Sequence, residues 1–210
     1  MEPNRCVDFR LLLISDRNLL PPGLSLLNSV EQALNGGLPA IQLREKDLPA
    51  RDLFRLAEQL RDMTRRYGAR LLINDRLDVA LAVEADGVQL GGKSLPTAAA
   101  RRILGPNRLI GCSCHSLADA QQAAVGGADF ITFSPVYFTP SKAPFGPPQG
   151  LAPLQAVCAA SPLPVFALGG IHLERVPAVL ACGADGVALI SAILAAPDPQ
   201  QATRALLAAL

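Results

Sequence analysis

The segment Ile41-Gln42-Leu43-Arg44-Glu45-Lys46 is the starting point for predicting the fold and the chemistry of this chain. It continues an apolar run that starts at Leu38 and suits a buried strand, and it ends in two cations one residue apart. Residues two apart in a strand share a face, so Arg44 and Lys46 point the same way as Gln42. Like charges on one face repel each other unless an anion lies between them. The segment is therefore either a solvated strand end or an anion site, and phosphate is the anion that it favours.

Apolar strands of this kind alternate with helices along the chain. Strands are predicted at residues 9–15, 38–43, 70–73, 87–90, 109–113, 130–134, 164–168 and 186–190. Helical spacing of apolar residues follows these strands, with Thr97 and Ser116 as expected N-caps, Gly68 as a stop, and a closing helix at residues 200–210. Strands that are apolar on both faces are typical of a parallel sheet covered by helices.

Eight such units favour a closed barrel over an open sheet. A doubly wound sheet is expected to have a glycine-rich turn after the first strand, whereas this sequence has Ser15-Asp16-Arg17-Asn18 there. We therefore predict an α/β fold, a single (β/α)8 TIM barrel over residues 1–210 with an N-terminal extension at residues 1–8. The long loop at residues 135–150, rich in proline and glycine, is predicted to be an active-site lid.

Composition narrows the classes of function. Half of the residues are hydrophobic and the formal net charge is +1, which argues against a general nucleic-acid or membrane-surface role. No apolar run approaches the ~18 residues of a membrane span, and residues 1–10 lack the apolar core of a signal peptide. We expect small-molecule substrates, no nucleic acid and no membrane, and a homo-oligomer is left open.

The cysteines form an odd, unpatterned set: Cys6, Cys112, Cys114, Cys158 and Cys182. Such a set predicts reduced thiols and a cytoplasmic protein. Cys112-x-Cys114-His115 could suggest a metal site, but zinc sites use three or four protein ligands and the sequence offers no second cluster.

The carboxyl ends of the strands of a barrel meet at one mouth, where the chemistry is placed. The first anion site predicted there consists of Arg44, Lys46, Asn74 and Lys142. Asp75 could hold a divalent cation against a diphosphate in that site, because magnesium takes one or two carboxylates plus phosphate oxygens. The alternative for Asp75 is a cap for the helix that follows it.

A second anion site is predicted where strands seven and eight end. Gly169-Gly170 follows the seventh strand and Ile190-Ser191 follows the eighth, which is a common phosphate cradle in barrels of this kind. The alternative for Gly169-Gly170 is a tight turn alone. A phosphate that faces a diphosphate suggests a reaction that joins two substrates and releases diphosphate.

These motifs, in this order, resemble the thiamin phosphate synthase / TenI family of (β/α)8 barrels from about Leu11 to Leu206. The matching pieces are Gln42-Leu43-Arg44-Glu45-Lys46, Ile73-Asn74-Asp75-Arg76, Gly111-Cys112-Ser113-Cys114-His115-Ser116, Pro135-Val136-Tyr137, Thr139-Pro140-Ser141-Lys142, Leu168-Gly169-Gly170-Ile171, Gly183-Ala184-Asp185-Gly186-Val187 and Ile190-Ser191.

The resemblance implies that hydroxymethylpyrimidine diphosphate is coupled to thiazole phosphate. It places the pyrimidine diphosphate on Gln42, Arg44 and Lys46, with assistance from Asn74, Ser113 and Lys142, and Mg²⁺ on Asp75. It places the thiazole phosphate on Thr139, Ser141, Gly169, Ile190 and Ser191, to which the glycine pair adds Gly170. Diphosphate would leave a pyrimidine methylene cation, which the thiazole nitrogen captures. The residues expected to carry the chemistry are Arg44, Lys46, Ser113, His115 and Lys142.

Two departures from the family pattern bear on function. Ser94 stands where a second magnesium aspartate is usual, and Gln89 stands where a histidine is usual. One carboxylate fewer weakens the hold on Mg²⁺.

Two other functions remain open at this stage. The thiazole tautomerases of the family use a histidine that matches His115 for proton transfer, for which imidazole is suited near neutral pH. A barrel that binds a phosphate ligand without catalysis is the other possibility. The retained Arg44, Lys46, Asn74, Asp75 and Lys142 favour the synthase.

Overall fold

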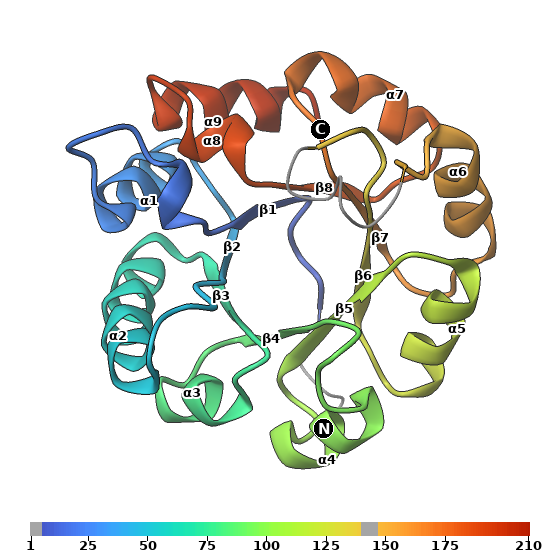
Figure 1. The fold of residues 1–210 in the computed structure, drawn as a ribbon, viewed down its shortest axis with the longest axis horizontal. Helices are drawn as coiled ribbons and strands as arrows, with labels where there is room; N and C mark the ends of the chain where they lie inside the picture. Colours follow the sequence, from blue (N-terminus) through green and yellow to red (C-terminus); the bar gives the residue numbers. More distant parts are fainter. Residues whose placement is uncertain (1–5, 140–146) are drawn as a thin grey trace.

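Eight parallel strands close into a barrel in sequence order, and helices surround it (Figure 1). The computed structural model describes residues 6–139 and 147–210. Its strands are β1 (Leu11–Ile14), β2 (Ala40–Leu43), β3 (Arg70–Asn74), β4 (Gly87–Leu90), β5 (Leu109–Cys114), β6 (Phe130–Phe133), β7 (Val165–Leu168) and β8 (Gly186–Leu189). The predicted (β/α)8 barrel is confirmed.

The outer layer consists of helices that alternate with the strands. They are α1 (Leu26–Asn35), α2 (Ala50–Tyr67), α3 (Leu77–Ala82), α4 (Thr97–Leu104), α5 (Leu117–Val125), α6 (Leu151–Ala160), α7 (Val176–Ala181), α8 (Ser191–Leu194) and α9 (Pro199–Ala208), with short 3-10 helices η1 (Arg17–Leu19) and η3 (Leu173–Arg175). None of these described helices is both long and apolar enough to span a bilayer.

Two apolar layers explain why the strands are apolar on both faces. Outward-facing residues such as Leu13 and Ile41 pack with the helices in one large cluster. The barrel interior holds a smaller cluster in which the rings of Phe9, Phe130 and Phe166 lie 5.3–5.7 Å apart, centroid to centroid. Phe9 precedes β1 and Phe130 begins β6, so these rings fill the amino-terminal end of the barrel and leave the carboxyl-terminal end for a cavity.

A repeated Ala-Asp pair fastens the amino-terminal end. Asp86, Asp129 and Asp185 each precede an even-numbered strand, and each carboxylate accepts the backbone N–H near the start of the strand before it, at 2.7–2.8 Å. Arginines complete two of these contacts, with Arg61 donating to Asp86 and Arg101 to Asp129, both at 2.6 Å. These Ala-Asp pairs therefore stabilise the amino-terminal end of the barrel, which is opposite the mouth.

Helix ends follow the predicted signals in part. Gly68 ends α2 in a left-handed conformation with φ of 67°, and the Ser116 hydroxyl caps α5 by accepting the N–H of Asp119. Thr97 was the wrong choice of cap, because Pro96 is the N-cap residue and the Thr97 hydroxyl lies 3.3 Å from the sulfur of Cys112. This contact with Cys112 of β5 takes the hydroxyl away from the helix end.

Three other boundaries differ from the prediction. The eighth strand ends at Leu189, and the short helix α8 follows it at once. The helix expected after the seventh strand begins as the 3-10 turn η3 and becomes α-helical only at Val176. The closing helix starts earlier than predicted, at Pro199, because Asp198 caps it.

Candidate active site

A cavity of about 380 Å³ opens at the carboxyl-terminal end of the barrel, and residues in or directly after every strand line it. Twelve of the fourteen predicted site residues lie on its wall: Gln42, Arg44, Lys46, Asn74, Asp75, Ser113, His115, Thr139, Gly169, Gly170, Ile190 and Ser191. The other two, Ser141 and Lys142, lie outside the described residues. The strand ends therefore converge as predicted, while the individual roles stay predictions.

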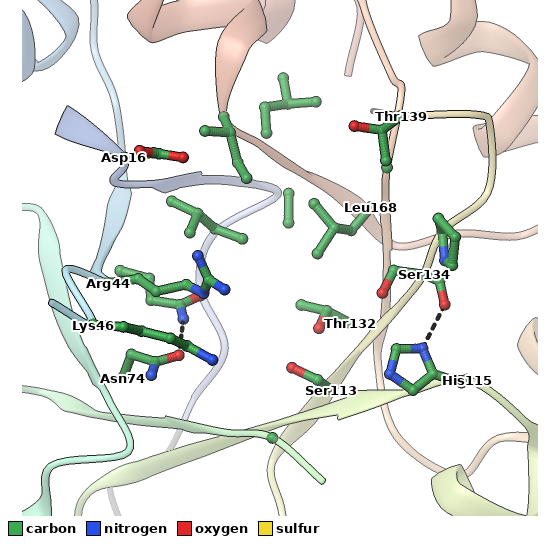
Figure 2. Close-up of a pocket in the computed structure, with 18 of the residues that line it drawn as sticks. Asp16, Arg44, Lys46, Asn74, Ser113, His115, Thr132, Ser134, Thr139 and Leu168 are labelled. Atoms are coloured by element: carbon green, nitrogen blue, oxygen red, sulfur yellow. Dashed lines mark hydrogen bonds between the residues drawn. The ribbon is translucent and has the colours of Figure 1, made fainter. Parts of the chain in front are cut away.

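The cavity has two chemically different walls. Figure 2 shows Arg44, Lys46 and Asn74 reaching in from one side, and Thr139 and His115 standing on the opposite side. The first wall comes from the ends of β2 and β3, and the second from β5 and the segments that follow β6, β7 and β8. Two anionic substrates could therefore face each other across one cavity.

A buried carboxylate fixes the position of the backbone that carries Arg44 and Lys46. Glu45 lies between the two cations in sequence, but its side chain is only 1% exposed and accepts hydrogen bonds from Ser15 Oγ at 2.6 Å and from the Arg17 guanidinium at 3.0 Å. Ser15 Oγ in turn accepts the backbone N–H of Arg44 at 2.8 Å. Glu45 thus neutralises Arg17, and no described residue forms an ion pair with Arg44 or Lys46.

A chain of hydrogen bonds links the first wall to the loop after β4. Gln42 Nε2 donates to Asn74 Oδ1 at 2.9 Å, and Asn74 Nδ2 donates to Asp75 Oδ2 at 2.8 Å. The Ser94 hydroxyl donates to the other carboxylate oxygen of Asp75, and accepts the N–H of Gly91 at 2.6 Å. The buried Gln42 Oε1 has no partner, so a donor of a bound substrate could fill that position.

Asp75 faces the cavity and does not cap the helix. Its φ of 60° is a left-handed conformation that non-glycine residues seldom adopt, and such strain is concentrated at functional sites. Helix α3 instead has Arg76 as N-cap residue, without a side-chain hydrogen bond. The capping alternative for Asp75 is therefore wrong, and its carboxylate is available at the mouth.

The resemblance implies magnesium at Asp75, and Ser94 takes the position of the second carboxylate. Among the described residues, no group of three or more His, Cys, Asp or Glu side chains could enclose a metal ion. Magnesium accepts one carboxylate when substrate phosphates and water complete its shell. The residues present therefore fit a magnesium ion that arrives with the diphosphate, and they do not fit a resident ion.

His115 is oriented by the backbone across the cavity rim. Its Nδ1 lies 2.6 Å from the carbonyl oxygen of Ser134, and a carbonyl oxygen can only accept, so Nδ1 carries the proton (Figure 2). In neutral imidazole this leaves Nε2 as an acceptor. His115 can therefore position a substrate or accept a proton.

The cysteines beside His115 belong to the barrel wall. Cys112 and Cys114 are both buried, and desolvation raises the pKa of the Cys114 thiol to about 12. A neutral buried thiol is a poor metal ligand, because the thiolate is the form that binds. The metal interpretation of Cys112-x-Cys114-His115 is therefore not supported.

The glycine pair after β7 serves a close approach of two loops. Gly169 and Gly170 have φ of 104° and 63°, and a Cβ on Gly170 would lie 2.5 Å from the carbonyl oxygen of Phe138. Arg175 contacts both loops. It donates to the Gly170 carbonyl at 2.6 Å, and its guanidinium lies 4.3 Å from the centre of the Tyr137 ring. The pair is thus a turn, and it also shapes the second wall of the cavity.

Sequence reasoning missed several lining residues. Thr132 and Ser134 lie in or after the apolar strand β6. Thr132 Oγ1 and Ser113 Oγ each lie 3.2 Å from Gln89 Nε2 inside the barrel. A single polar residue within an apolar strand is the signal that could have revealed Thr132. Lys93, which lines the cavity from the loop after β4, was also missed.

Comparisons with known proteins agree with this geometry. The sequence profile of the family described as thiamine monophosphate synthase matches residues 11–193. A protein of Geobacter sulfurreducens, named provisionally as a thiamine-phosphate synthase, is 58% identical over 97% of this chain and 95% of its own. A thiamine-phosphate synthase of Roseiflexus castenholzii is 49% identical over 87% of this chain and 80% of its own. The solved structure of a thiamine phosphate pyrophosphorylase from Pyrococcus furiosus superposes with a TM-score of 0.86 at 40% identity, covering 95% of this chain and 94% of that one.

Proposed function

The chain belongs to the thiamine monophosphate synthase family, and we propose that it couples hydroxymethylpyrimidine diphosphate to thiazole phosphate and releases diphosphate. It is an enzyme of thiamin biosynthesis, a transferase of the thiamine-phosphate synthase type. The observation that carries the choice of substrates is the first wall of the cavity, where Arg44 and Lys46 meet no carboxylate partner among the described residues. Unpaired cations at the mouth of a barrel suit a highly charged anion.

The first wall would act on the leaving group. Diphosphate departure builds negative charge on the bridging oxygen, and donors fixed in advance stabilise that charge without reorganising. Arg44 can give a bidentate contact and Lys46 a point charge, while the Ser15–Glu45 contact holds their backbone in place. Magnesium bound between Asp75 and the phosphate oxygens would add charge stabilisation.

The second wall would hold the nucleophile. We propose that the phosphate of the thiazole substrate lies against the backbone of Gly169, Gly170, Ile190 and Ser191, with Thr139 beside it. The thiazole nitrogen would then face the pyrimidine methylene carbon that loses diphosphate. Capture of a cation by that nitrogen needs orientation and exclusion of water more than it needs a base.

We also place this reaction in the cytoplasm. All five cysteines are free, including the partly buried Cys158 and Cys182, as expected in a reducing compartment.

The proposal is tested with purified protein, both substrates and magnesium, by following thiamin phosphate by mass spectrometry and diphosphate by a coupled assay. Formation of both products in equal amounts is expected, and each should depend on both substrates. The tautomerase alternative is run in parallel with thiazole carboxylate phosphate and no magnesium. Diphosphate release no faster than without enzyme would end the proposal, and isomerisation in its place would establish the alternative.

A further inference from the structure

Lysine is rare in this chain. Of its 19 lysines and arginines only three are lysines, at positions 46, 93 and 142, and the remaining 16 are arginines. Seven arginines form ion pairs with carboxylates among the described residues, and those of Arg17 and Arg76 lie close to the carboxyl-terminal ends of the strands. Within residues 6–139 and 147–210, arginine and not lysine thus supplies the cations of these ion pairs.

Both described lysines lie at the cavity. Lys46 and Lys93 line it together with Arg44, and none of the three has an ion-pair partner or a side-chain hydrogen bond within the described part of the chain. An ammonium is a compact point charge with three freely rotating donors, which suits a ligand with many oxygens whose positions change during a reaction. The placement of both described lysines at the cavity points to a ligand and not to the fold.

The neighbours of Lys93 indicate which part of the ligand it would meet. It precedes Ser94, whose hydroxyl donates to Asp75, and Asp75 in turn accepts from Asn74 on the first wall. Both oxygens of the Asp75 carboxylate are therefore occupied by donors from the protein. The carboxylate of Asp75 already accepts from protein donors, whereas the ammonium of Lys93 has no partner among the described residues, so the free donor of this corner suits diphosphate oxygens better than a resident metal ion.

We propose that Lys93 is a third cation of the diphosphate site, which contacts the terminal phosphate beside Asp75 and lowers the dependence of diphosphate binding on magnesium. The inference rests on the proposed function for the identity of the substrate. It adds a residue from the loop after β4 to the wall formed by β2 and β3. A charge attached to the protein is present whether or not metal is bound.

The test is calorimetric titration of inorganic diphosphate, in EDTA and again in magnesium, with wild type, Lys93→Gln, Lys93→Arg and Arg102→Gln. Arg102 is an exposed cation on α4 outside the cavity, so Arg102→Gln controls for the loss of one positive charge. In EDTA, Lys93→Gln should raise the Kd about five- to twentyfold, while Arg102→Gln should change it less than about twofold. Lys93→Arg should recover most of the affinity. In magnesium the difference in Kd between Lys93→Gln and wild type should decrease, because the ion neutralises part of the charge of diphosphate.

A second measurement observes the amine itself. Reductive methylation with ¹³C-formaldehyde keeps the charge of lysine, and three lysines give few enough NMR signals to be assigned with Lys93→Gln. Diphosphate should shift the Lys93 signal. A Lys93→Gln protein that binds diphosphate in EDTA within twofold of wild type, or a wild type that does not bind it, would overturn the proposal.

The two proposals fail in different ways. Loss of binding in Arg44→Gln with full binding in Lys93→Gln would reject the role of Lys93 and leave the synthase function intact. Lys93-dependent diphosphate binding in a protein that couples no substrates would support Lys93 and reject the synthase function.

Discussion

Arg44 and Lys46 owe their availability to Glu45, the residue between them. A buried carboxylate that accepts from Ser15 and from Arg17 must point away from the cavity, which leaves its two neighbours to face the cavity. The same contacts join the end of β1 to the end of β2. At the scale of single residues, Arg44 and Lys46 therefore keep their charge unpaired because Glu45 pairs with Arg17 and not with them.

Arg44→Ala should lower kcat/KM for coupling on the order of ten- to a hundredfold. A charge-assisted contact to a leaving diphosphate contributes about 1.5–3 kcal/mol, and this contact would strengthen as the bond breaks. Steady-state kinetics measure the loss, with Arg102→Ala as the matched control. A decrease of less than threefold would show that Arg44 does not meet the leaving group.

His115 distinguishes the synthase from the tautomerase. If the thiazole nitrogen captures a cation, no base is needed, and His115→Ala should reduce coupling by less than about tenfold. A tautomerase would lose its activity in the same variant, while Asp75→Asn would leave it nearly intact. Rates of both reactions for both variants give the comparison. A loss of about a thousandfold in coupling would mean that His115 moves a proton in the synthase reaction.

At the scale of elements, turns and short helices shape the second wall. The β7 turn packs on residues 135–138, since the Val136 and Tyr137 amides donate to the carbonyls of Leu168 and Gly169 at 2.9 and 3.0 Å. The first turn of α8 follows β8 directly. The geometry of that wall therefore depends on backbone contacts, for which Gly169 and Gly170 leave room.

Gly170→Ala should destabilise the protein more than Gly23→Ala. Both glycines have positive φ, which costs an alanine about 1–2 kcal/mol, but only at Gly170 would the new Cβ also meet backbone, 2.5 Å from the Phe138 carbonyl oxygen. Around Gly23 the space is open. Urea unfolding of the two variants isolates the cost of the clash. Equal losses of unfolding free energy would show that the loops separate easily.

Asp129→Ala should lower stability without affecting the chemistry. Asp129 receives the Ile110 amide at 2.7 Å and the Arg101 guanidinium at 2.6 Å, with its side chain 9% exposed. Removing one partner of such a buried pair costs about 3–5 kcal/mol. Thermal unfolding should report the loss, while KM for both substrates at low temperature should stay within twofold of wild type. A changed KM would mean that the two ends of the barrel are coupled.

At the scale of the whole molecule, strand periodicity was enough to predict the barrel, and the barrel was enough to bring residues from Gln42 to Ser191 to one mouth. Contacts between side chains distant in sequence were beyond that reasoning. Nothing in the order of residues shows that Ser15 and Glu45 meet, or that Thr97 turns to Cys112 and leaves the helix cap to Pro96. Such contacts depend on how strands and helices pack.

The central claim is that one cavity holds the two anionic substrates on opposite walls. A crystal structure of the protein with inorganic diphosphate and thiazole phosphate tests it most directly. We expect diphosphate against Arg44, Lys46 and Lys93, and the thiazole phosphate against Gly169, Gly170 and Ser191, with the thiazole ring between the two anions. Both anions on the same wall, or either one bound away from the mouth, would contradict it.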